Sequence, residues 1–192
     1  MYALPAAAAP PPRRQVLVGT ALASMATIML VGGMLAIWIL QRERARDAGG
    51  TWLPEGTTIP EVPANVMLIG VWSLCVFAQW AVYSARRADR AHTALALGIV
   101  GLMTLALINA QAYVYAQMEL PIADGGYAGM FYAITGTMVA LFVVGLVFSA
   151  ISAFRFLGGR IADREIIAAN ALYWYVLATV FSAVWLIVYV AK

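Results

Sequence analysis

The sequence predicts an all-α integral membrane protein, a bundle of five transmembrane helices. The 192 residues are 64% hydrophobic and 11% charged, whereas soluble domains are about 45–50% apolar and about 25% charged. Five apolar stretches contain no Asp, Glu, Lys, Arg or His, and each is longer than the ~20 residues that cross a bilayer core as a helix. They do not alternate in polarity as the strands of a membrane barrel do, and a helix satisfies its own backbone hydrogen bonds in lipid.

The chain begins with residues 1–15, in which four consecutive alanines precede three consecutive prolines. This composition predicts a disordered tail. Arg13 and Arg14 precede an apolar run, as in a signal peptide, but the apolar part of a signal peptide has only about 7–15 residues. The run over residues 16–40 therefore predicts a retained first span. The five-helix domain is expected over residues 16–192, with further spans over residues 62–84, 93–118, 128–154 and 166–190.

Four polar connections separate these spans. Residues 41–61 contain Gly49-Gly50 and two prolines, and residues 119–127 contain Pro121 and Gly125-Gly126 with no positive charge. Residues 85–92 are short and basic, and residues 155–165 combine Gly158-Gly159 with three arginines. Glycine and proline at these points are typical of turns between helices.

The distribution of positive charge predicts the orientation. The N-terminal segment and the second and fourth connections carry eight arginines, whereas the opposite side carries three arginines and Lys192. Positive residues are enriched on the cytoplasmic side, so we expect a cytoplasmic N-terminus and an external C-terminus. Trp52, Tyr127, Tyr173 and Tyr189 lie near span ends, where aromatic side chains are expected to anchor at the membrane interface.

Small residues recur at helical spacing in several spans, and such faces let helices approach closely in lipid. They are Gly19, Ala23 and Thr27 in the first span, Gly98 and Gly101 in the third, and Gly136 and Ala140 in the fourth.

The residues predict no catalytic, cofactor or metal site in this chain. A nucleophile needs a nearby base, and the spans contain none. His92 is a single histidine at a span end, where a solvated residue is expected rather than a metal ligand. Cys75 is expected to be a small buried residue, and Met25, Met29 and Met34 are expected to pack rather than bind a soft metal. The arginines are explained by topology and anionic lipid, so no nucleic-acid partner is predicted.

The polar residues inside the spans are neutral: Thr27, Ser73, Gln79, Asn109, Gln111, Thr135, Thr137, Thr179 and Ser182. Asn109 and Gln111 are two residues apart and therefore point to different helix faces. Each is expected to donate or accept a hydrogen bond across a helix interface. A role in binding a substrate stays open as an alternative.

Several segments resemble a known family. The fifth span begins Tyr173-Trp174-Tyr175-Val176-Leu177-Ala178, the fourth contains Phe131-Tyr132 and Thr135-Gly136, and the third ends Gln111-Ala112-Tyr113-Val114-Tyr115. These segments resemble subunit III of haem-copper cytochrome c oxidases, which reads Tyr-Trp-His-Phe-Val-Asp, Phe-Tyr-x-x-Thr-Gly and Gln-Tyr-Glu-Tyr at these places. Gly32-Gly33 and the loop from Trp52 to Pro54 are similar to the start of the short five-helix bacterial form. The resemblance covers residues 16–192.

The departures from the family pattern are systematic. Where the family has intramembrane Glu, His and Asp, this chain has neutral residues: Thr27, Val114, Met138, Leu141, Tyr175 and Ala178. In the family these groups are thought to collect protons for the catalytic subunit, so the resemblance does not carry that role to this chain. The family also holds structural phospholipids in an interior cleft, a role that needs mainly apolar walls.

The resemblance therefore implies a non-catalytic, subunit III-like component of a bacterial haem-copper terminal oxidase in the inner membrane. Its implied partners are membrane lipids, the oxidase catalytic subunit I and other oxidase subunits, with haem and copper in the catalytic partner. Gly19, Ala23 and Gly136 are candidate contact residues. The alternative is a small oligomeric membrane carrier or channel component, motivated by Gln79, Asn109 and Gln111. Carriers commonly have charged or interrupted helices at the binding site, and these features are not apparent in the sequence.

Overall fold

The computed structural model describes residues 14–54, 56–121, 125–159 and 164–191. Its helices are α1 (Gln15–Asp47), α2 (Glu61–Arg86), α3 (Arg90–Met118), α4 (Gly125–Leu157) and α5 (Arg164–Val184), and α5 continues as the π-helix η1 (Trp185–Val190). Within these described ranges, five helices are long and apolar enough to cross a membrane. The predicted all-α fold is confirmed, and the five predicted spans correspond to these five candidate membrane helices. Of the expected disordered tail, residues 1–13 lie outside the described residues, and Gln15 is already helical.

Every helix extends past its predicted span, and α1 extends the furthest. α1 continues for seven residues beyond Leu40, so the predicted loop over residues 41–61 is wrong in its first part and begins at Ala48. Residues 41–47 contain Gln, Arg, Glu and Ala, which are strong helix formers, and the basic Arg44 and Arg46 favour the last turn of a helix. α4 begins at Gly125, three residues before the predicted span. Hydropathy marks the part of a helix inside lipid and does not mark where the helix ends.

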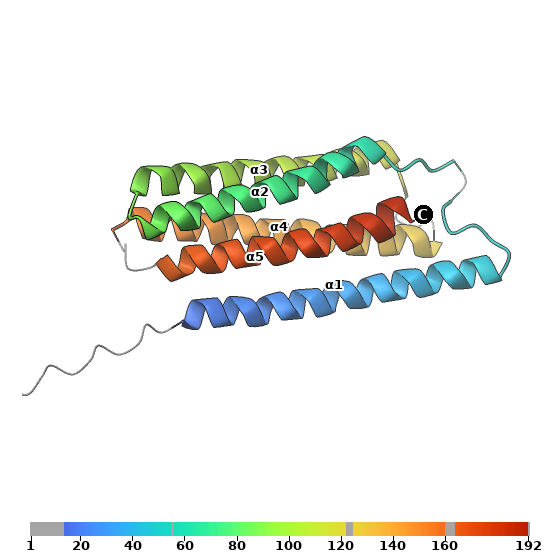
Figure 1. The fold of residues 1–192 in the computed structure, drawn as a ribbon. Helices are drawn as coiled ribbons and strands as arrows, with labels where there is room; N and C mark the ends of the chain where they lie inside the picture. The colour runs from blue at the N-terminus through green and yellow to red at the C-terminus, as the bar shows by residue number, and fades with distance from the viewer. Residues whose placement is uncertain (1–13, 55, 122–124, 160–163, 192) are drawn as a thin grey trace, which may run out of the picture.

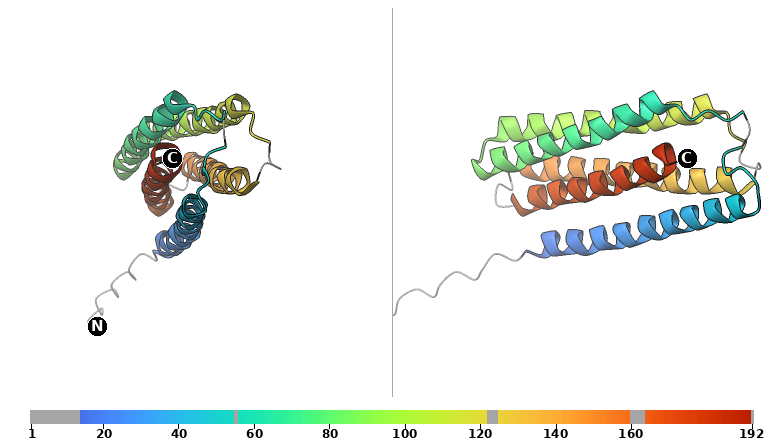
Figure 2. Two further views of the ribbon diagram at one scale, coloured as in Figure 1. Left: turned by 90° about the vertical axis from the view of Figure 1, so that its right-hand side faces the viewer. Right: turned by 45° about the vertical axis from the view of Figure 1, so that its right-hand side comes forward.

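The helices form three layers (Figures 1 and 2). α1 lies on one side, α4 and α5 lie in the middle, and α2 and α3 lie on the other side. α5 packs against α1, α2 and α4, and it is the most buried of the five membrane-crossing helices. Because α5 contacts helices of both outer layers, its side chains form a large part of the interior of the bundle.

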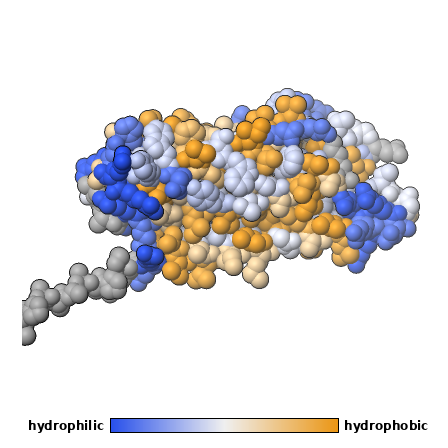
Figure 3. All heavy atoms as spheres, in the orientation of Figure 1, coloured by the Kyte–Doolittle hydropathy of each residue, from blue (hydrophilic) through white to orange (hydrophobic). Residues whose placement is uncertain are grey.

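The outer surface has the distribution expected for a membrane protein. Figure 3 shows hydrophobic residues over the middle of the bundle and hydrophilic residues at both ends. Large apolar side chains on the outer faces, such as Leu22, Met29 and Phe154, are exposed. In a bilayer, lipid covers such faces.

In the basic connection between α2 and α3, Asp89 caps the start of α3. Its side chain accepts a hydrogen bond from the backbone N–H of His92, and its Oδ2 lies 2.6 Å from His92 Nδ1. The backbone hydrogen bond of His92 is the main cause that lowers the pKa of Asp89. Both side chains are solvent-accessible, so the prediction that His92 is a solvated residue at a helix end is confirmed.

The small faces do not mark close helix contacts within the chain. A Cβ built at Gly19, Gly98 or Gly136 would meet nothing within 4 Å, and at Gly101 it would meet only an ordinary contact with Leu146. These faces therefore do not hold the helices of this chain together, and the expectation that Gly19 and Gly136 contact another subunit stays a prediction. The close approach is at Gly145, where a Cβ would lie 2.6 Å from Trp174 and 2.8 Å from Tyr173. A glycine at this position lets α5 place two large rings against the backbone of α4.

The aromatic residues near the span ends also differ from the prediction. Tyr127, Tyr173 and Tyr189 are buried inside the bundle, so their assignment as interface anchors is wrong. Trp52 is half-buried, and its ring centroid lies 5.1 Å from that of Trp38 and 5.5 Å from that of Tyr127. The Tyr189 hydroxyl finds a partner in the interior by donating to Gln111 Oε1 at 3.0 Å, whereas the Tyr127 hydroxyl has none among the described residues.

Candidate functional site

One set of polar side chains lies in the interior between α4 and α5. Ser149 Oγ accepts hydrogen bonds from Asn170 Nδ2 and from Trp174 Nε1, both at 3.0 Å. All three residues are buried. Because each donor has an acceptor, this cluster stabilises the contact between the two helices and offers no free group to a ligand.

A second interior set connects α3 with its neighbours. Gln111 accepts from Tyr189, and Tyr115 donates to Thr135 Oγ1 at 2.8 Å. Gln111 is buried and Asn109 is exposed, so the prediction that they point to different faces is confirmed. The expected bond across a helix interface is present for Gln111, whereas Asn109 has no such partner among the described residues.

A third set lies outside, along the contact of α2 with α5 and η1. We call it the α2–α5 seam, and it consists of three hydrogen-bonded pairs. Trp185 Nε1 donates to Asn65 Oδ1 at 2.9 Å, Trp72 Nε1 donates to Ser182 Oγ at 3.0 Å, and Tyr175 Oη donates to Gln79 Oε1 at 3.0 Å. The residues from α2 are seven apart, which keeps them on one helix face.

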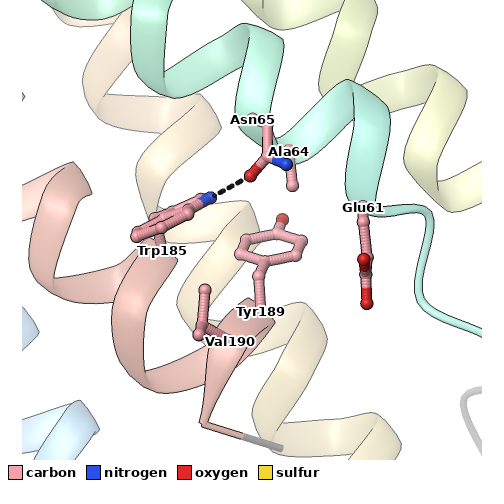
Figure 4. Close-up of a pocket in the computed structure, with 6 residues that line it drawn as sticks. All are labelled: Glu61, Ala64, Asn65, Trp185, Tyr189 and Val190. Atoms are coloured by element: carbon pink, nitrogen blue, oxygen red, sulfur yellow. Dashed lines mark hydrogen bonds between the residues drawn. The ribbon is translucent and has the colours of Figure 1, made fainter.

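Two hollows lie along this seam. The first has a volume of about 320 Å³ and lies at the end of the bundle, with Glu61, Asn65, Trp185 and Tyr189 among its lining residues (Figure 4). Figure 4 shows the bond from Trp185 to Asn65 at its edge. The second has a volume of about 310 Å³ and is lined by Trp72, Cys75, Val76, Gln79 and Tyr175.

The seam can form hydrogen bonds, and its groups do not assemble a metal site. Among the described residues, no three His, Cys, Asp or Glu side chains lie together. Cys75 is buried and its thiol donates to the Trp174 carbonyl at 3.5 Å, which confirms the expected buried cysteine. Of the three methionines, Met25 and Met29 are exposed on α1, and Met34 accepts a hydrogen bond from Thr137.

The structure also shows where the six positions lie at which the resemblance puts titratable residues in the family. Val114, Met138 and Ala178 are buried in the apolar core. Thr27 donates to the Ala23 carbonyl of its own helix, and Tyr175 is part of the α2–α5 seam. Leu141 is half-buried, and its carbonyl accepts from the Tyr173 hydroxyl at 2.7 Å.

Sequence reasoning missed three polar residues of these sets: Asn65, Ser149 and Asn170. Two signals were present. Asn65 starts the seven-residue series that continues through Trp72 to Gln79, and Asn170 lies one helical turn before Trp174. Neither signal says which helix supplies the partner.

Comparisons with known proteins agree on one family. The family model described as cytochrome c oxidase subunit III matches residues 17–192. The chain is 28% identical over 148 residues to cytochrome c oxidase subunit 3 of Cyprinus carpio and 29% identical over 148 residues to that of Bos taurus. Each alignment covers 76% of this chain and 56% of the relative. The chain thus spans little more than half the length of these curated relatives.

Proposed function

Because this chain belongs to the cytochrome c oxidase subunit III family, we propose that it is the subunit III of a bacterial haem-copper terminal oxidase. It packs against the catalytic subunit I and supports the assembly and stability of the complex. Reduction of oxygen and the coupled pumping of protons belong to the partner subunit, which holds haem and copper.

The family match over residues 17–192 carries this proposal. The five spans support it, since their polar groups are neutral and several of the interior ones pair with each other. Neutral, paired groups suit a subunit that stabilises a complex, because redox and proton chemistry in a membrane needs titratable groups or cofactors. The bacterial setting rests on the similarity of Gly32-Gly33 and the loop from Trp52 to Pro54 to the short five-helix form.

In the proposed orientation the N-terminus is cytoplasmic and the C-terminus is external. The excess of arginine beside the N-terminal segment, in the α2–α3 turn and after α4 supports this orientation. The external end of the bundle then contains Trp38, Trp52 and Tyr127, which pack together.

A structural phospholipid is part of the same proposal. Between α1 and α5 lies a hollow of about 190 Å³. Val31, Gly32 and Leu35 of α1 and Val180 and Ala183 of α5 are among the residues that line it. Apolar walls of this kind suit an acyl chain, whose binding needs no hydrogen bonds.

The proposal predicts that an affinity-tagged form of this chain, solubilised mildly from its native membrane, is recovered with haem. The expected result is a haem absorption spectrum in the purified fraction and a larger co-purified subunit. Recovery of the intact chain in good yield without any haem protein would contradict the proposal. Solute flux through proteoliposomes that contain the chain alone would instead support the carrier or channel alternative.

A second prediction concerns the position where the family has a glutamate. Thr27→Val removes a hydroxyl that bonds only to its own helix, to Ala23. Since neither side chain titrates, proton uptake by the assembled oxidase should stay nearly unchanged. Proton uptake by reconstituted complex, with haem content as the control for assembly, measures this. A large slowing with normal haem content would show that proton collection survives in this chain.

A further inference from the structure

We propose that the outward side of the α2–α5 seam binds a transmembrane helix of a partner oxidase subunit, and that this helix presents a hydrogen-bond acceptor to the amide of Gln79. The inference rests on the proposed function and adds the surface and the chemistry of the contact. It follows from three features of the seam: the outward direction of its unpaired donors, their depth in the membrane and the hollow beside Gln79.

Two of the three pairs of the seam use the oxygen of an amide internally and leave its nitrogen outside, whereas Ser182 of the third pair donates to the Ala178 carbonyl of its own helix. Tyr175 donates to Gln79 Oε1, and Trp185 donates to Asn65 Oδ1. The amide nitrogens of Gln79 and Asn65 have no acceptor within the described part of the chain. Both residues are exposed. Each amide therefore offers two N–H groups to whatever covers α2 and α5.

Gln79 lies within the hydrocarbon region of the membrane, where acyl chains cannot accept a hydrogen bond from its amide. α2 has no charge between Glu61 and Arg86, so the middle of its membrane segment lies near Ser73. At a rise of 1.5 Å per residue, Gln79 is about 8 Å from that middle, well inside a hydrocarbon half-thickness of about 15 Å. Acyl chains contain no acceptor, and an unsatisfied buried donor costs about 1–3 kcal/mol. Asn65 is about 13 Å from the middle, close enough to the interface for water or headgroups to serve.

The hollow beside Gln79 provides a recess that a side chain of the partner helix can fill. It has a volume of about 310 Å³ and is open on the outer surface. Val76 on its wall is 67% exposed, and Trp72 and Tyr175 are also exposed. Aromatic side chains next to a recess are typical of protein interfaces, and a recess of this size accepts a side chain from a neighbouring helix. The hollow between α1 and α5, by comparison, has no free amide among its lining residues.

A second copy of this chain is a poorer occupant than a different subunit. If two copies met through this face, each would offer Gln79 the same amide, whose carbonyl oxygen already accepts a hydrogen bond from Tyr175 and would have to accept a second with its other lone pair. A helix of a different subunit can present a hydroxyl, an unpaired amide oxygen or an unpaired backbone carbonyl at this depth. Such a group accepts a hydrogen bond from the Gln79 amide without sharing an oxygen with Tyr175.

Photocrosslinking in native membranes tests the surface. A benzophenone amino acid replaces Val76 at the seam or, as the matched control, Leu102, which is 69% exposed on α3. We expect illumination to join the Val76 variant to a larger oxidase subunit, with several-fold less of this product from the Leu102 variant. Products with lipid alone, products with a second copy of the chain, or equal yields at the two positions would each overturn the inference.

Three substitutions test the chemistry, with the amount of co-purified haem as the measurement. Gln79→Leu removes the outward donor, and several-fold less haem should be recovered with the chain. Tyr175→Phe breaks the same internal hydrogen bond but keeps the donor, and Asn109→Leu removes an exposed amide from α3; both should retain most of the haem. Equal losses in Gln79→Leu and either of the other variants would contradict the inference. Helix content by circular dichroism confirms folding of each variant. The unmodified chain tests the proposed function separately, because its recovery with haem does not depend on which surface binds.

Discussion

Gly145→Ala is expected to destabilise the folded chain by about 1–3 kcal/mol, the usual cost of forcing a side chain into a packed interior. The new methyl group would lie 2.6 Å from the ring of Trp174 and 2.8 Å from that of Tyr173. Trp174 cannot easily move away, because its side chain is fully buried and its Nε1 is hydrogen-bonded to Ser149. α4 and α5 must therefore separate slightly or lose that bond.

Gly136→Ala is the matched control in the same helix. A Cβ at Gly136 meets nothing within 4 Å, and alanine favours a helix over glycine by up to ~1 kcal/mol. The two substitutions should change stability in opposite directions. The unfolding of the purified chain in mixed micelles, as the fraction of a denaturing detergent is raised, measures both. Equal stability of the two variants would show that α4 and α5 are not packed closely at Gly145.

Ser149→Ala is expected to cost about 1–3 kcal/mol, because it removes the acceptor of two buried donors. Asn170 Nδ2 and Trp174 Nε1 would both be left without their partner. Each orphaned donor in a protein interior costs about 1–3 kcal/mol, whereas a hydrogen bond between membrane helices contributes about 0.6 kcal/mol on average. The expected loss of stability for Ser149→Ala therefore lies below the sum for two orphaned donors and above the average for one hydrogen bond between membrane helices.

Ser152→Ala provides the comparison. Ser152 is also buried on α4, but its hydroxyl donates only to the Phe148 carbonyl four residues earlier. That carbonyl also belongs to the helix, so the loss should be below ~0.5 kcal/mol. The same unfolding measurement separates the two serines. Similar losses at both positions would mean that the cluster around Ser149 adds little beyond its packing.

The interior of the bundle shows why pairing between helices was hard to predict. The polar residues of each span are visible in the sequence, yet the partners of Trp174 and of Tyr189 are 25 and 78 residues away in the chain. The helices are apolar on nearly all faces, so no single face of a span identifies itself as the inner one. The small residues at Gly19 and Gly136 do not say which helix packs on them, and the structure places the close contact within the bundle at Gly145.

The tyrosines give a second example. Tyr127, Tyr173 and Tyr189 lie near the ends of apolar runs, where lipid headgroups are the usual environment. In the bundle all three turn inward. Tyr173 and Tyr189 donate to the Leu141 carbonyl and to Gln111 on other helices, whereas the Tyr127 hydroxyl has no partner among the described residues and its ring stacks on Phe131. The contacts available in the interior, a hydrogen bond for Tyr173 and Tyr189 and neighbouring rings for Tyr127, decide the direction of the ring rather than its level in the membrane.

The sequence by itself determined the class of the protein, its five spans and its family resemblance. Hydropathy is a local property that each segment carries whatever its neighbours are, so the charge-free runs are sufficient to place the helices. Only the tertiary structure decided which polar groups meet and which remain free on the surface. Those outcomes depend on the rotation and axial position of each helix against the others. Thus the close packing at Gly145 and the outward amide of Gln79 became visible only when α2, α4 and α5 were seen together.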